Sequence, residues 1–131
     1  MVTALKNAVL VAAVMGLSTT SGGVRAERYE IYEYSQKTLL KNWALSVCLA
    51  GVAKDEWHRE DANASASAYL EFGRQPIEAY EELRDLASKY EARIYSHSSS
   101  VKSELNTMKC IDLFHSKELN ALATQWVKKY P

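Results

Sequence analysis

The segment PIEAYEELRDLASKYEARIY, residues 76–95, decides the fold class of this chain of 131 residues. Its apolar residues recur every three or four positions, a spacing that places them on one face of an α-helix. Acidic residues dominate the first turns and basic residues the last ones, as the helix dipole favours. Pro76 suits the first helical position because its missing N–H would have no partner there. We therefore predict an amphipathic helix over 76–95. Its apolar face consists of Ile77, Tyr80, Leu83, Ala87, Tyr90 and Ile94.

The same period continues on both sides of this segment. It predicts four further helices, over 30–53, 57–72, 105–115 and 116–130. Asp55 and Ser116 are candidate N-caps, because their side-chain oxygens can accept hydrogen bonds from free backbone N–H groups. No run of residues alternates with a period of two, so we predict no sheet. The predicted fold is all-α, a single compact domain of about five helices.

The predicted helices also have expected inward positions. The second one places Trp57, Ala64, Ala68 and Phe72 at helical spacing, and the fourth places Met108, Ile111 and either Leu113 or Phe114 inward. In the last helix the expected apolar face consists of Leu119, Leu122, Ala123, Trp126, Val127 and Tyr130.

Residues 1–26 have the organisation of a secretory signal peptide. A short region with Lys6 precedes ten apolar residues, 8–17, and small residues lead to Val24-Arg25-Ala26. This order of charged, apolar and small residues is typical of a cleaved export signal. A membrane-spanning helix needs roughly 20 apolar residues, so this run is too short. We predict cleavage after Ala26, a mature domain over 27–131 and export to the periplasm without membrane attachment. The alternative is a short buried helix.

The charge of the mature chain argues against a nucleic-acid binder. The chain has 16 basic and 16 acidic residues, and cleavage removes Lys6 and Arg25 but no acid, which leaves a net charge of −2. Binding to phosphate backbones requires net or clustered positive charge. No dense basic run is present in the sequence.

The two cysteines predict one disulfide. Export leads to an oxidising compartment, where disulfides persist. Cys48 and Cys110 are the only cysteines, so only one intramolecular pairing exists. It would join the first predicted helix to the fourth. The alternative is a pair of buried free thiols.

No catalytic or metal-binding motif is present in the sequence. The three histidines, His58, His97 and His115, lack the i, i+4 spacing of a helical metal site. There is no Gly-x-Ser-x-Gly, no glycine-rich phosphate loop and no Cys-x-x-Cys. We therefore predict a protein that is not an enzyme, with no catalytic residues, no metal and no cofactor.

Two segments carry a resemblance to a known family. Residues 109–119, KCIDLFHSKEL, resemble the C-terminal signature of immunity proteins against type VI secretion amidase effectors. Residues 42–50, NWALSVCLA, resemble the helix of those proteins that carries their N-terminal cysteine. Tyr80 and Tyr95 also lie where that family tends to have tyrosines, and the resemblance covers residues 34–128. Ile111 and Phe114 depart mildly from its pattern.

This resemblance implies a small, helical, dimeric periplasmic protein. It would bind a cysteine amidase that cuts peptidoglycan peptides and would block the active-site cleft with a protruding loop. The polar stretch after the third predicted helix is the candidate loop, because hydroxyl-rich residues there end the helical pattern. The candidate contacts are Tyr95, Ser96, His97, Ser98, Ser99, Ser100, Val101 and Lys102.

Several alternatives stay open at this point. The loop can be a plain exposed connection, in which case the acidic face around Glu78, Glu82 and Asp85 is the next candidate contact. The chain can also act against a different periplasmic effector, or it can be a periplasmic helical domain that binds a small ligand.

Overall fold

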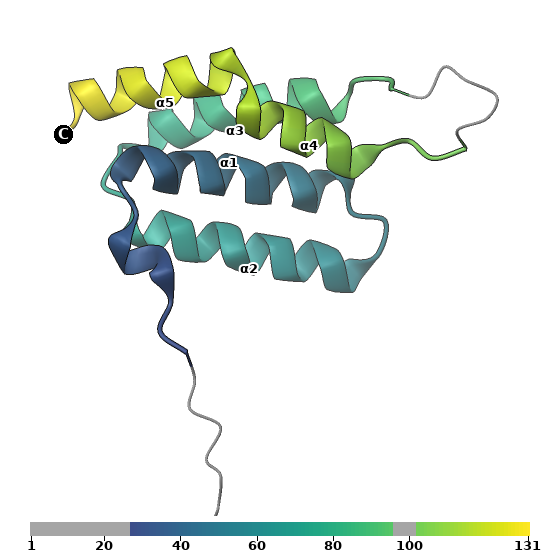
Figure 1. Ribbon diagram of the computed structural model, residues 1–131, viewed down its shortest axis with the longest axis horizontal. Coiled ribbons are helices and arrows are strands. Elements are labelled where there is room, and N and C mark those ends of the chain that lie inside the picture. Colours follow the sequence, from purple (N-terminus) through teal and green to yellow (C-terminus); the bar gives the residue numbers. More distant parts are fainter. Residues whose placement is uncertain (1–26, 96–101) are drawn as a thin grey trace, which may run out of the picture.

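The computed structural model describes residues 27–95 and 102–131 (Figure 1). The predicted signal peptide, residues 1–26, lies outside the described residues. Within the described ranges the chain forms five α-helices and one short 3₁₀ helix, with no strand. This confirms the predicted all-α fold. The elements are η1 (Glu30–Glu33), α1 (Gln36–Val52), α2 (Glu56–Phe72), α3 (Ile77–Glu91), α4 (Asn106–His115) and α5 (Lys117–Lys129).

Helix caps explain several of the boundaries. The side chains of Asp55 and Ser116 accept hydrogen bonds from the backbone N–H groups of His58 and Leu119, both at 3.0 Å, and so cap α2 and α5 as predicted. The first helix was predicted to be continuous over 30–53, which is wrong. Ser35 is extended and its Oγ accepts a bond of 3.1 Å from the N–H of Thr38. This cap starts α1 at Gln36 and separates it from η1.

The third helix was predicted to extend to Tyr95 but ends at Glu91. The backbone N–H groups of Ala92 and Arg93 bond back to Ser88 and Tyr90 and close the last turn. Beyond it, Ile94 is exposed. A further helical turn would bury no apolar surface there, because the side chain has no core to pack against.

Helix α1 is the centre of the bundle. It packs against each of the other four α-helices, and Figure 1 shows α2 on one side of it and α3, α4 and α5 on the other. The core is contributed mainly by α1 and by the three helices on that second side. Its largest fully buried side chains are Leu40, Leu83, Leu113, Leu119, Cys48 and Cys110.

The disulfide is confirmed. Cys48 on α1 and Cys110 on α4 are bonded at 2.08 Å, and both residues are completely buried. The bond lies inside the hydrophobic core and joins the central helix to α4. Free thiols are therefore excluded as the alternative, because the chain has no other cysteine.

Several predicted inward positions are wrong. The exposed residues are Trp57, Ala64, Ile77, Ile94, Met108, Ile111 and Tyr130. In α2 the only buried residue is Ala66, because this helix packs mainly on α1 and η1. In α4 the buried face is set by Cys110 and Leu113, which turns Met108 and Ile111 outward. Within the described ranges, no helix is long and apolar enough to cross a membrane.

Candidate interaction surface at one end of the bundle

The candidate site lies where α3 ends and α4 begins. Figure 1 shows that the connection from α1 to α2 lies at the same end of the bundle. Of the eight predicted contact residues, the structure describes Tyr95 and Lys102. The other six, Ser96, His97, Ser98, Ser99, Ser100 and Val101, lie outside the described residues. The described geometry is therefore that of the chain leaving α3 and returning to α4.

The departing chain is held by Tyr95. Its hydroxyl donates a hydrogen bond of 2.7 Å to Oδ2 of Asp112 on α4. Because this carboxylate stabilises the neutral phenol, the bond raises the pKa of Tyr95. Two residues earlier, the guanidinium of Arg93 lies over the ring of Tyr90, with 3.4 Å between its central carbon and the ring centroid. The chain after α3 is thus fixed to both α3 and α4.

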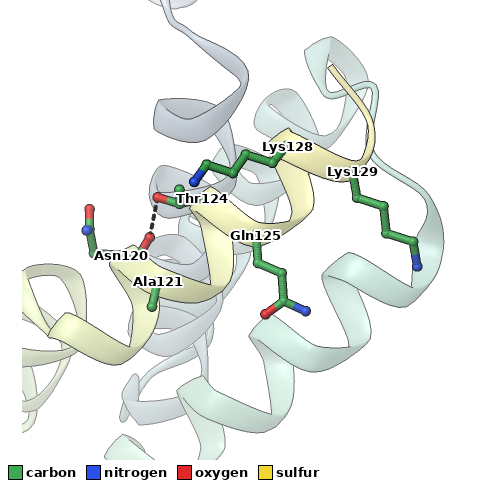
Figure 2. A pocket seen from close by; sticks show the side chains of 6 residues that line it. All are labelled: Asn120, Ala121, Thr124, Gln125, Lys128 and Lys129. Carbon is green, nitrogen blue, oxygen red and sulfur yellow. Dashed lines mark hydrogen bonds between the residues drawn. The ribbon is translucent and has the colours of Figure 1, made fainter.

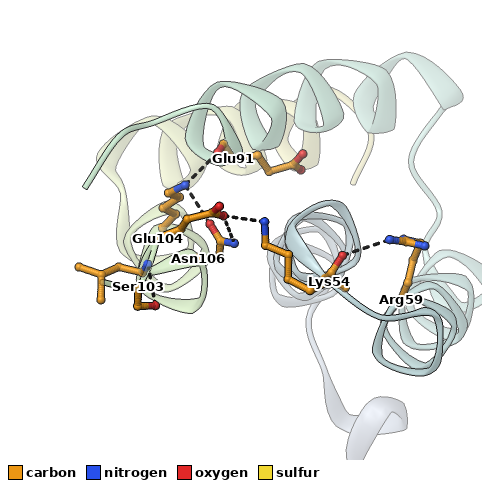
Figure 3. Close-up of polar contacts among 9 residues, drawn as sticks. Lys54, Arg59, Glu91, Ser103, Glu104 and Asn106 are labelled. Atoms are coloured by element: carbon orange, nitrogen blue, oxygen red, sulfur yellow. Dashed lines mark hydrogen bonds and ion pairs between the residues drawn. The ribbon is translucent and has the colours of Figure 1, made fainter. Parts of the chain in front are cut away.

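The returning chain is held by Glu104. Its Oε2 lies 2.7 Å from Nζ of Lys54, in the connection between α1 and α2, and accepts a bond of 2.9 Å from Nδ2 of Asn106 (Figure 3). These contacts hold the pKa of Glu104 below its usual range, chiefly through the hydrogen bond from Lys54. Both side chains of the ion pair are exposed, so its main effect is on position and not on stability.

Lys109 joins the two sides of the site. This residue is buried, and its Nζ donates to the backbone oxygen of Glu91 at 3.3 Å and to Oδ1 of Asn106 at 2.9 Å. Glu91 is the last residue of α3 and Asn106 the first of α4 (Figure 3). The amine therefore satisfies a free carbonyl at the end of α3 and ties it to the start of α4.

The backbone at the start of α4 is unusual. Leu105, which precedes the helix, has a φ of 55°. This value lies in the left-handed region, which residues other than glycine rarely adopt. The N–H of Leu105 bonds to Oγ of Ser103 at 3.3 Å. Such a conformation costs about 1–2 kcal/mol and persists where neighbouring contacts impose it. Here the contacts of Glu104 and Lys109 lie on either side of it.

The acidic face considered as the next candidate is only partly free. Glu78, Glu82 and Asp85 are exposed on α3. However, Oε2 of Glu82 accepts a bond of 3.1 Å from the indole N–H of Trp126 on α5. One of the three carboxylates thus takes part in packing α5 on α3.

The histidines are not brought together as a site. His58 bonds to Asp55 through its Nδ1 at 2.6 Å in the first turn of α2, while His115 ends α4. His97 lies outside the described residues. Within the described ranges no group of three His, Cys, Asp or Glu side chains is placed to hold a metal ion.

A depression on α5 offers no enclosed small-ligand site. Its lining consists of Asn120, Ala121, Thr124, Gln125, Lys128 and Lys129 (Figure 2). All six residues belong to one helix, and the hydroxyl of Thr124 is used in a bond of 2.7 Å to the backbone oxygen of Asn120. Ligand sites normally need walls from several elements that bury most of the ligand. This depression therefore does not favour the small-ligand alternative.

Sequence reasoning missed the residues that anchor the candidate loop. Lys54, Glu104 and Asp112 carry no signal in the sequence, because their partners are distant along the chain. Lys109 could have been suspected from its place beside Cys110, since a helical neighbour of a core residue can be partly buried.

Comparison with known proteins identifies what this bundle is similar to. Residues 38–123 match the model of the family described as Tai4, type VI secretion system (T6SS), amidase immunity protein. No curated protein matches the chain at a significant level.

Solved structures give the same result. A structure of the effector–immunity system Tae4/Tai4 from Salmonella typhimurium contains a chain with 49% identity and a TM-score of 0.71, over 76% of this chain and 96% of that one. A structure from work on type VI-secreted toxins and self-resistance proteins in Serratia marcescens has 34% identity and a TM-score of 0.69, over 79% and 87%. The effector–immunity complex Tae4–Tai4 from Enterobacter cloacae has 23% identity and a TM-score of 0.65, over 76% and 99%, and supports the fold alone.

Proposed function

Because the chain belongs to the family of type VI secretion system amidase immunity proteins, we propose that it binds and inhibits a peptidoglycan amidase effector by covering its active site. The observation that carries this proposal is the family match over residues 38–123, which include every buried residue of the hydrophobic core cluster except Trp126. The relative with 49% identity comes from an effector–immunity system, which supports a cognate amidase as the partner. The protein acts by binding and is not an enzyme.

The proposed contact is the segment from Tyr95 to Lys102. The fixed positions of its two ends support this, because a binding element held at both ends loses less conformational freedom when it binds. Tyr95 is bonded to α4, and the returning chain is bonded through Glu104 to Lys54. A short segment rich in serine also fits a cleft that accepts peptide backbone.

The place of action follows from the substrate. Peptidoglycan is outside the inner membrane, so the immunity protein has to meet the enzyme in the periplasm. Residues 1–26 supply the export signal in this proposal, and the buried disulfide is consistent with an oxidising compartment. Cleavage after Ala26 is tested by N-terminal sequencing of the exported protein.

The mature chain is proposed to form a homodimer. Two-fold dimers are the commonest symmetric assemblies of soluble proteins. Light scattering at micromolar concentration tests this, and a mass of one chain would refute it.

The decisive experiment is co-purification with a candidate cognate amidase effector, followed by an inhibition assay on peptidoglycan. The variant with Ser98→Glu, Ser99→Glu and Ser100→Glu leaves every residue of the described hydrophobic core unchanged, so we expect it to keep its fold. Its inhibition constant should rise at least tenfold, which corresponds to about 1.4 kcal/mol.

The matched control adds the same three charges elsewhere. Ser67, Asn120 and Ala121 are exposed on α2 and α5, and their replacement by Glu should leave inhibition unchanged. If the loop variant has the inhibition constant of wild type, this segment is refuted as the contact, and the acidic face of α3 becomes the next candidate.

A further inference from the structure

Helix α4 has two apolar faces, and only one of them has a partner within the described chain. Cys110 and Leu113 are completely buried against the core. Met108 and Ile111, three residues apart and so neighbours on the helix surface, are 52% and 48% exposed. At 100° per residue these two pairs point to opposite sides of the helix. A solvated helix face normally carries polar residues, so this outward apolar pair requires an explanation.

The outward pair adjoins the proposed contact segment. Met108 and Ile111 line one open groove together with Lys102, Ser103 and Leu105 from the returning chain. Leu105 precedes α4, is half-buried and lies three residues before Met108. We name the surface made by Leu105, Met108 and Ile111 the α4 patch.

Polar groups surround this patch. Lys54 and Glu104 form their ion pair in the same groove, and Asp112 holds the hydroxyl of Tyr95 at its edge. An apolar centre with a polar rim is the usual composition of a protein-binding surface, in which methionine is enriched. Lys54 and Glu104 pair with each other, and Lys102 and Asp112 add one charge of each sign, so the patch does not favour a strongly charged partner.

From this placement we propose that the α4 patch is the apolar second part of the surface bound by the amidase effector. This inference rests on the proposed function. The reason for this occupant is continuity. Lys102 is one end of the proposed contact segment, and it lines the same groove as Met108 and Ile111, so a protein that contacts Lys102 also meets these two side chains. The patch would pack against apolar surface of the amidase.

The test replaces the outward pair without disturbing the helix. A variant with Met108→Gln and Ile111→Gln keeps good helix formers and leaves the buried face of α4 intact. Its inhibition constant for the cognate amidase should rise at least tenfold, with an unchanged melting temperature. A second variant with alanine at both positions removes only the side chains and should show the same loss.

The chain offers a matched control at the opposite end of the bundle. Leu70 on α2 and Ile77 on α3 are 41% and 62% exposed, and Figure 1 shows the connection between these helices far from the start of α4. The variant with Leu70→Gln and Ile77→Gln should inhibit like wild type.

The outcomes separate this inference from the proposed function. If the wild-type protein does not inhibit the amidase, both the proposed function and the inference on the α4 patch are refuted. If wild type inhibits and the glutamine and alanine variants of the patch inhibit equally well, only the α4 patch is refuted. A change in oligomeric state with unchanged inhibition would also refute it and would assign the patch to a contact between copies of this chain.

Discussion

Removal of the disulfide should strongly destabilise the core. The bond between Cys48 and Cys110 spans 62 residues of sequence. In the chain-entropy model, opening a loop of this length costs about 4 kcal/mol. A domain of this size has a total stability of about 5–15 kcal/mol, so the loss is a large share of it. Each kcal/mol lowers the melting temperature by about 4–8 °C, which predicts a fall of roughly 15–30 °C for the double alanine variant.

The assay is thermal unfolding of the mature chain followed by circular dichroism. The variant with Cys48→Ala and Cys110→Ala is compared with oxidised wild type and with wild type refolded under reductant. The reduced protein retains both sulfur atoms, so it separates the loss of the cross-link from the loss of packing. Thiol titration of native exported protein should give no free thiol. A fall of less than about 5 °C for the reduced protein would refute the entropic account.

Two further substitutions test the last residue of α3, Glu91, and the first residue of the candidate contact segment, Tyr95. Burial raises the pKa of Glu91, so its folded pKa lies above the ordinary value of 4.5 and stability is lost as pH rises through that pKa. Glu91→Gln should therefore be at least as stable as wild type at pH 7, measured by urea unfolding, and an advantage that grows below pH 4.5 would contradict this. Tyr95→Phe keeps the ring but loses the hydrogen bond to Asp112, so the inhibition constant should rise several-fold with little change in melting temperature. In a double-mutant cycle with Asp112→Ala, the effects of the two substitutions on the inhibition constant should not add. Additive effects would contradict the pairing.

The parts of the fold that depend on neighbouring residues could be predicted from sequence. The caps at Asp55 and Ser116 are interactions over three residues, and both are present. The N-cap at Ser35 is also an interaction over three residues. It was not predicted, because the apolar period continues across this position and indicates one continuous helix. The end of α3 could not be predicted, because the period extends to Ile94 while the core ends before it.

Burial was harder to predict than helix formation. A periodic pattern shows which residues share a face, but not how many other elements cover that face. Helix α2 packs mainly on α1 and η1, so Trp57 stays exposed in its first turn. In α4 two apolar faces compete, and the disulfide at Cys110 decides which one turns inward. The anchors of the candidate loop depend on tertiary placement in the same way: Tyr95 and Asp112 are 17 residues apart and meet only because α3 and α4 pack together.

The position of α4 explains how a small bundle can present a binding segment. Two adjacent residues fix this helix to different parts of the core: Lys109 to the end of α3 through Glu91, and Cys110 to α1 through Cys48. Lys109 also bonds to Asn106, the first residue of α4, where the proposed contact segment returns to the bundle. The disulfide and the buried amine of Lys109 therefore fix the position of α4, to which the proposed contact segment is joined. Because these contacts already order the two ends of the proposed contact segment, less conformational entropy is lost there when a partner binds.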